Sequence, residues 1–186
     1  MIPIGKNHER VGLVPSPMRK ILPLALIGAG LFLLSATIGY WRFDEAIKNP
    51  SAARLPERIT NLPLTSKSTG QQAVWELTRL HEKGFPLASA AVGTYGAEHQ
   101  VMLWVSGAPI TPLAGRMLVS MRDKIAEGRS PFIPTGVRKD GNRVIYELEG
   151  MDQVHFYFQS GKLLVWMAAN AELADEALEE VLKFYP

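Results

Sequence analysis

An uncharged apolar stretch of 21 residues, from Ile21 to Trp41, constrains this chain more than any other feature. At about 1.5 Å of rise per residue, a helix of this length spans roughly 30 Å, the thickness of the hydrocarbon core of a bilayer. Pro23 falls in the first turn, where its missing N–H would have had no intrahelical partner. The sequence therefore predicts a transmembrane helix over 21–41, preceded by an N-terminal tail at 1–20.

Residues that suit the membrane–water interface flank this stretch, because amphipathic rings and long cations favour headgroup depth. They are Arg19, Lys20, Tyr40, Trp41 and Arg42. The tail and residues 41–60 carry four cations each, but two adjoin the N-terminal end of the span and only one adjoins the other end. We therefore expect a single-pass signal-anchor with the N-terminus in the cytoplasm and the C-terminal domain outside it, periplasmic or extracellular.

One face of the predicted helix consists mostly of small residues, which would let a second helix approach closely in lipid. The face comprises Ala25, Gly28, Ala29, Phe32, Ser35, Ala36 and Gly39. Small residues are also common in membrane spans that pack against nothing, so both interpretations stay open. A cleaved signal peptide is disfavoured, since the apolar stretch is long and its best cleavage pattern is Thr37-x-Gly39.

The net charge of +2 is unevenly distributed. Residues 1–60 hold 8 cations and 4 acids, a net +4, whereas residues 61–186 hold 12 cations and 14 acids, a net −2. The basic excess lies around the predicted span, which indicates membrane lipids as partners and no nucleic acid. With no cysteine, the chain has no disulfide and no thiolate ligand for a metal.

Three prolines among polar residues predict a semi-extended linker at 42–67. Residues 68–186 read as an α+β domain with about three helices on one face of a largely antiparallel sheet of about six strands. Helical periodicity with start and stop residues predicts helices at about 69–83, 112–127 and 171–185. Alternating segments joined by turn residues predict strands at about 87–95, 100–106, 136–139, 143–149, 152–159 and 163–169.

No motif for acyl transfer, nucleotide hydrolysis or zinc proteolysis occurs, and no two histidines have metal-ligand spacing, so we expect no metal, cofactor or enzyme activity. A third hypothesis is an enzyme whose catalytic group joins His155 and Tyr157 to Glu147 or Glu149 on the neighbouring strand. The alternative is that this row is merely the solvated face of a sheet.

Phe132 and Ile133, between two prolines in a predicted loop, are candidate docking residues. The leading hypothesis is a non-catalytic accessory or assembly subunit of a larger membrane protein complex, docking other membrane subunits through its extramembrane domain. Small single-span subunits recur in energy-transducing complexes, respiratory or photosynthetic, which is an analogy only. The alternative is a membrane-tethered module that binds a ligand or peptide.

Overall fold

The computed structural model describes residues 18–81, 84–128 and 130–186, and it divides into two compact units with the boundary after Trp41. The first unit is described from the start of helix α1 (Met18–Lys48). Its portion Ile21–Lys48 is long and apolar enough to cross a membrane. The hydroxyls of Ser35 and Thr37 each donate a 2.8 Å hydrogen bond to the carbonyl four residues earlier, so they need no partner from a surrounding lipid phase.

The second unit, Arg42–Pro186, contains the end of α1 and one nine-stranded sheet with three further helices. The strands are β1 (Ser51–Ala52), β2 (Arg58–Ile59), β3 (Leu62–Thr69), β4 (Ser89–Tyr95), β5 (Val101–Gly107), β6 (Ile133–Asp140), β7 (Arg143–Gly150), β8 (Gln153–Ser160) and β9 (Leu163–Ala169). The helices are α2 (Gln71–His81), α3 (Thr111–Ala126) and α4 (Ala174–Phe184), with a short 3-10 turn η1 (Ala97–His99) between β4 and β5.

The sheet runs in the order β2-β3-β4-β5-β9-β8-β7-β6, and every pairing along this path is antiparallel. Among the strands of the described residues, only β1 pairs in parallel, beside the start of β4. The α+β class with an N-terminal apolar helix and a mostly antiparallel sheet is thus confirmed. The described residues form four helices and nine strands, more than the three helices and six strands that the sequence predicted.

The segment 42–67, which we expected to be a linker, instead holds the last turns of α1, then β1, β2 and most of β3. Ile59 is completely buried in the main core. Two buried tyrosines fix this segment further, since the Tyr95 hydroxyl donates to the Pro56 carbonyl at 2.9 Å and the Tyr185 hydroxyl donates to the Arg54 carbonyl at 2.6 Å. Residues 51–67 are therefore an ordered part of the domain.

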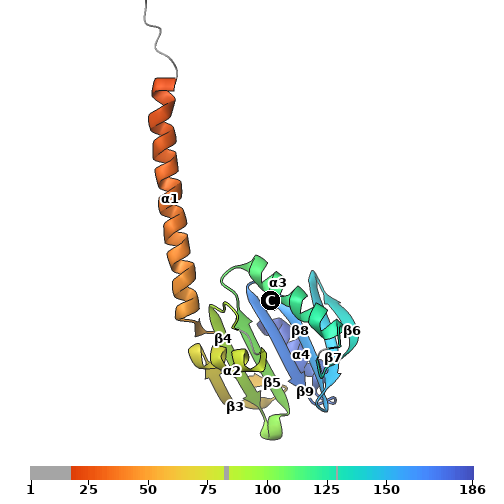
Figure 1. Cartoon of the computed structure of the whole chain (residues 1–186). Helices are drawn as coiled ribbons and strands as arrows, with labels where there is room; N and C mark the ends of the chain where they lie inside the picture. The colour runs from red at the N-terminus through yellow and green to blue at the C-terminus, as the bar shows by residue number, and fades with distance from the viewer. Residues whose placement is uncertain (1–17, 82–83, 129) are drawn as a thin grey trace, which may run out of the picture. The chain divides into compact units, whose positions relative to one another are not determined.

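The helices cover both faces of the sheet, whereas the sequence predicted helices on one face only (Figure 1). Helices α2 and α3 lie over one face, and α4 packs against the other, where Ala177, Leu178 and Val181 join the largest core cluster. Strand β8 explains the difference: His155, Phe156, Tyr157 and Phe158 are all buried, so both of its faces are covered.

Candidate functional site

The sheet face beneath α2 and α3 carries a row of aromatic rings in cross-strand register. Tyr146, Tyr157, Trp166 and Trp104 are direct neighbours across β7, β8, β9 and β5. The ring centroids of Tyr146 and Tyr157 lie 4.8 Å apart and those of Tyr157 and Trp166 lie 5.1 Å apart, both stacked. Directly opposed side chains in a sheet interact in this way, and the row forms a flat apolar floor.

A cavity of about 690 Å³ lies over Trp166 and Trp104 of this row, with residues from α2 and α3 in its walls; we call it the α2–α3 groove. Its aromatic lining consists of Phe85, Trp104, Phe132 and Trp166. Four methionines also line it: Met102, Met117, Met121 and Met151. Its volume and its mainly apolar lining are typical of small-molecule sites in proteins.

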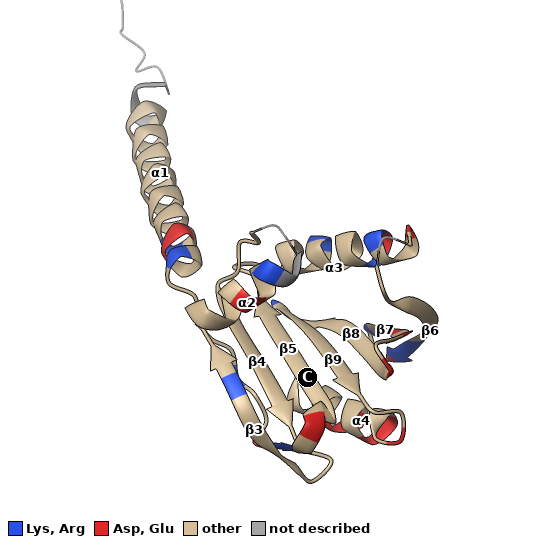
Figure 2. Ribbon diagram, turned by 60° about the horizontal axis from the view of Figure 1, so that its bottom comes forward, with Lys and Arg blue, Asp and Glu red and all other residues tan. Residues whose placement is uncertain are grey.

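The strands under the groove carry no charged residue. None of β4, β5, β8 and β9 contains Asp, Glu, Lys or Arg, and Figure 2 shows this part of the sheet without either charge colour. The charges gather on the helices and on the outer strands. A molecule seated in the groove therefore meets no formal charge from the floor.

Phe132 closes one end of the groove. Its ring centroid lies 4.7 Å from that of His155 and 5.1 Å from that of Trp166, and its side chain is half-buried. The close approach requires Gly150, because a Cβ there would lie 2.8 Å from the Phe132 ring. Of the two docking candidates, Phe132 thus faces the domain, while Ile133 is 68% exposed at the start of β6.

His155 is buried beneath this ring, and both of its nitrogens have partners. Nε2 lies 2.9 Å from the Gly150 carbonyl oxygen, which can only accept, and Trp166 Nε1 donates to Nδ1 at 3.1 Å. The proton therefore sits on Nε2 and the ring is neutral. Burial lowers the pKa of His155, against a smaller opposing effect of the Gly150 carbonyl. Both nitrogens are occupied, so the ring acts here as a structural bridge.

The structure does not bring together the group of His155, Tyr157 and Glu147 or Glu149. Glu147 is in register with Phe156 and Glu149 with Val154, so both carboxylates point to the α4 side of the sheet. Glu147 pairs there with Arg138 at 2.9 Å. Burial raises the pKa of Tyr157 to about 12, with a smaller contribution from Tyr146. The alternative of a solvated row is also wrong, since His155 and Tyr157 are 3% and 1% exposed.

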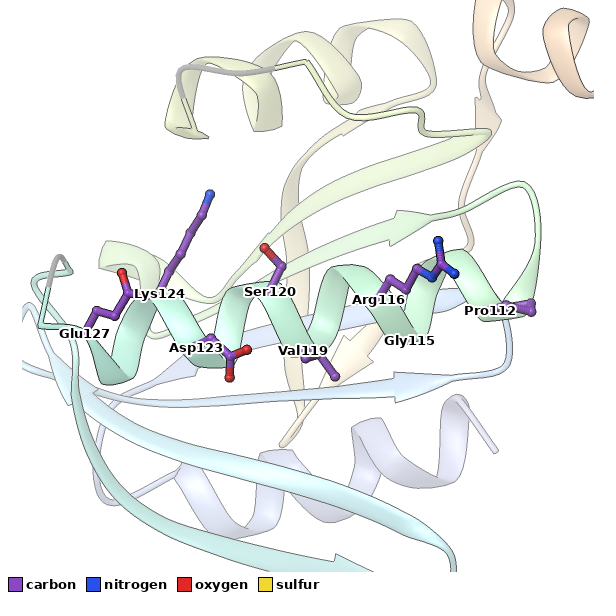
Figure 3. A pocket seen from close by; sticks show the side chains of 8 residues that line it. All are labelled: Pro112, Gly115, Arg116, Val119, Ser120, Asp123, Lys124 and Glu127. Atoms are coloured by element: carbon purple, nitrogen blue, oxygen red, sulfur yellow. The ribbon is translucent and has the colours of Figure 1, made fainter.

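Two cations lie at the edge of the groove on α3. Arg116, Ser120 and Lys124 follow one another at intervals of four residues and all line the groove. Figure 3 shows their side chains on the same side of the helix, with the Ser120 hydroxyl between the two cations. A second hollow, of about 790 Å³, is lined by residues of α3 and by Glu127 directly after it. It is an open surface, because a single helix cannot enclose a cavity.

The other candidate residues lie outside the groove or outside the described part of the chain. Arg19 and Lys20 fall in the first turn of α1, and Tyr40 and Trp41 are 73% and 63% exposed on it. A Cβ built at Gly28 or Gly39 would have no neighbour within 4 Å, so the small-residue face stays a prediction. His8 lies outside the described residues, and among those described no three His, Asp or Glu side chains could hold a metal ion.

No family model matches this chain, and comparisons with curated proteins and with solved structures found no match either. The sequence alone did not indicate the groove that Met117 and Met121 line on α3. The sequence signal that could have indicated the groove is the absence of charged residues from β5 and β9, because this pattern predicts that both faces of these strands are buried.

Proposed function

We propose that this protein is a non-catalytic, single-span membrane subunit that works by binding, with α1 as anchor and the α2–α3 groove as binding site. The observation that carries this proposal is the groove, a cavity of about 690 Å³ lined by four aromatic residues and four methionines. Methionine side chains adapt to irregular apolar shapes and are frequent at binding surfaces. The groove therefore fits an apolar ligand.

The second part of the proposal is that α1 anchors the protein in a membrane. Helix α1 is long and apolar enough to span a bilayer, and its interface residues Tyr40 and Trp41 lie where the apolar stretch ends. We propose the orientation with the N-terminus in the cytoplasm, because paired cations adjoin that end of the span. The binding domain would then lie outside the cytoplasm, at the membrane surface.

A neutral solvatochromic dye such as Nile red tests whether the groove binds apolar molecules. Ser106 lies on β5 and lines the groove, so Ser106→Phe should fill the cavity and reduce dye binding. Val119→Phe is the matched control, since Val119 lies 44% exposed on α3 and does not line the groove. Equal dye binding by both variants and the parent chain would refute the proposed site.

The accessory or assembly role is a second candidate function, and the bare small-residue face of α1 favours it. A partner helix in a larger complex could pack there closely. Gly28→Ile and Gly39→Ile should then reduce co-purification with other membrane subunits in mild detergent. Gly30→Ile, a residue of α1 outside the small-residue face with equally open surroundings, should leave it unchanged. A parent chain that extracts as a solitary monomer would exclude this role.

A further inference from the structure

We propose that the ligand of the α2–α3 groove is a long-chain fatty acid, with its hydrocarbon chain on the aromatic floor and its carboxylate at Arg116 and Lys124. This inference rests on the proposed function and names the chemistry of its ligand. Three features of the groove support it: the polarity of its lining, its size, and the charge at its edge.

The lining favours a hydrocarbon chain over a polypeptide. A peptide brings an N–H and a C=O with every residue, and these need partners wherever water is excluded. The floor offers few, because β5, β9 and β8 are hydrogen-bonded to strands on both sides and both nitrogens of His155 are occupied. The Gln153 side-chain amide likewise donates to the His99 carbonyl and to Asn170 Oδ1. A fatty acyl chain needs no such partners.

The size of the groove agrees with this choice. Its volume of about 690 Å³ lies within the range of small-molecule sites in proteins, and a fatty acid is a ligand of that class. A single flexible chain fits this volume, and the methionines can follow its bends.

The edge of the groove supplies the charge that a carboxylate needs. In the part of the chain that the structure describes, neither Arg116 nor Lys124 forms an ion pair, whereas Arg122 on the same helix pairs with Asp123 at 2.7 Å. Arg116 and Lys124 lie eight residues apart, about 12 Å along the axis, with Ser120 midway. Both are long side chains that extend to the same side, so a carboxylate near the Ser120 hydroxyl lies within reach of both.

The test uses quenching of tryptophan fluorescence by brominated lipid in the full chain, held in nanodiscs of a zwitterionic phospholipid. The chain has four tryptophans, and Trp41→Phe with Trp75→Phe leaves Trp104 and Trp166, which both line the groove. Dibromostearate is compared with its methyl ester, which has the same chain and no charge. We expect half-maximal quenching by the acid at a concentration at least tenfold lower than by the ester.

Charge variants in this background locate the head group. Arg116→Gln combined with Lys124→Gln should weaken binding of the acid about tenfold and leave the ester unchanged. Arg122→Gln, which removes one charge from the same helix outside the groove, should leave both unchanged. Arg116, Arg122 and Lys124 are exposed, so the charge variants are expected to fold. This test does not require the Ser106→Phe variant, which fills the groove.

The outcomes separate this inference from the proposed function. Equal quenching by acid and ester would overturn the fatty acid while leaving an apolar site intact. Quenching by neither, together with binding of Nile red, would also overturn it and point to another ligand class, such as an apolar peptide. Binding of none of these probes would overturn both proposals.

Discussion

At the scale of single residues, His155 shows how a polar group is accommodated inside the domain. Its ring joins the Gly150 carbonyl on β7 to the Trp166 indole on β9, and Phe132 covers it. A charged ring would lose the hydrogen bond from Trp166, because both nitrogens would then be donors. The sequence placed His155 and Tyr157 on one face correctly, but alternation alone does not reveal whether a helix covers that face.

We predict that acidification destabilises the domain through His155. Its folded-state pKa lies below the ordinary value of about 6.5, so the unfolded chain binds a proton first as the pH falls through that value. The contribution of His155 to stability should therefore be complete above about pH 7 and decrease below 6.5. His155→Gln should show a flatter dependence of the free energy of unfolding on pH, measured by urea unfolding at pH 7.5, 6.5 and 5.5. Parallel curves for both chains would contradict this.

Gly150→Ala should displace Phe132. The new Cβ would lie 2.8 Å from the Phe132 ring and 3.0 Å from the Pro131 carbonyl oxygen, so the loop must move at a cost of about 1–3 kcal/mol. Thermal unfolding and Nile red binding would report the loss of stability and the opened groove. Gly115→Ala on α3 is the control: its Cβ meets only an ordinary contact at 3.4 Å, and the change should be neutral or stabilising.

At the scale of elements, local signals identified the hairpins well and missed the three N-terminal strands, β1 to β3. Strands β6 to β9 follow alternating sequence joined by short turns, two of which use Gly141 and Gly161 at positive φ. Strand β3 was not predicted because it contains Pro63 and four of its eight residues are exposed. Ser68 lies in β3, and its hydroxyl donates to Glu76 Oε2 at 2.8 Å. Pairing with β4, a tertiary contact, decides its conformation.

Arg143 of the β6–β7 hairpin binds the C-terminal end of α4. We therefore predict that Arg143→Lys is not a conservative substitution. Arg143 donates to the Leu182 carbonyl from both terminal nitrogens at 3.2 Å, as well as to the Tyr185 carbonyl. A lysine cannot reproduce this fork, and the last carbonyls of α4 would lose partners. We expect a loss of about 1–2 kcal/mol in the free energy of unfolding, measured by urea titration. Arg122→Lys, on an exposed pair, should change it by less than about 0.5 kcal/mol.

At the scale of the whole molecule, the α+β class and the N-terminal apolar helix followed from the sequence, whereas the domain boundary did not. Prolines and polar residues at 42–67 have the composition of a linker. What makes this segment structural is long-range: Ile59 enters the core, and Tyr95 and Tyr185 bind its carbonyls from β4 and the C-terminus. Contacts between residues as far apart as 54 and 185 cannot be predicted from local pattern.

This boundary is testable by truncation. A chain of residues 49–186 should fold cooperatively, because it retains all nine strands. A chain of residues 68–186, beginning at the predicted domain boundary, should lose its cooperative thermal transition. It lacks Ile59 and most of β3 and leaves two buried tyrosine hydroxyls without acceptors. Equal midpoints by circular dichroism would restore the linker interpretation.

The order of the strands also governs how the nascent polypeptide matures. Strand β5 ends at Gly107, but its neighbour β9 begins only at Leu163, so one edge of the charge-free segment VMLWVSG stays unpaired until the C-terminal end of the chain is synthesised. Unpaired apolar edges are where chains associate wrongly during biogenesis. Release of the chain from the ribosome before β9 is translated would leave this edge of β5 unpaired and the fragment prone to aggregation, so the last hairpin completes the pairing of the sheet.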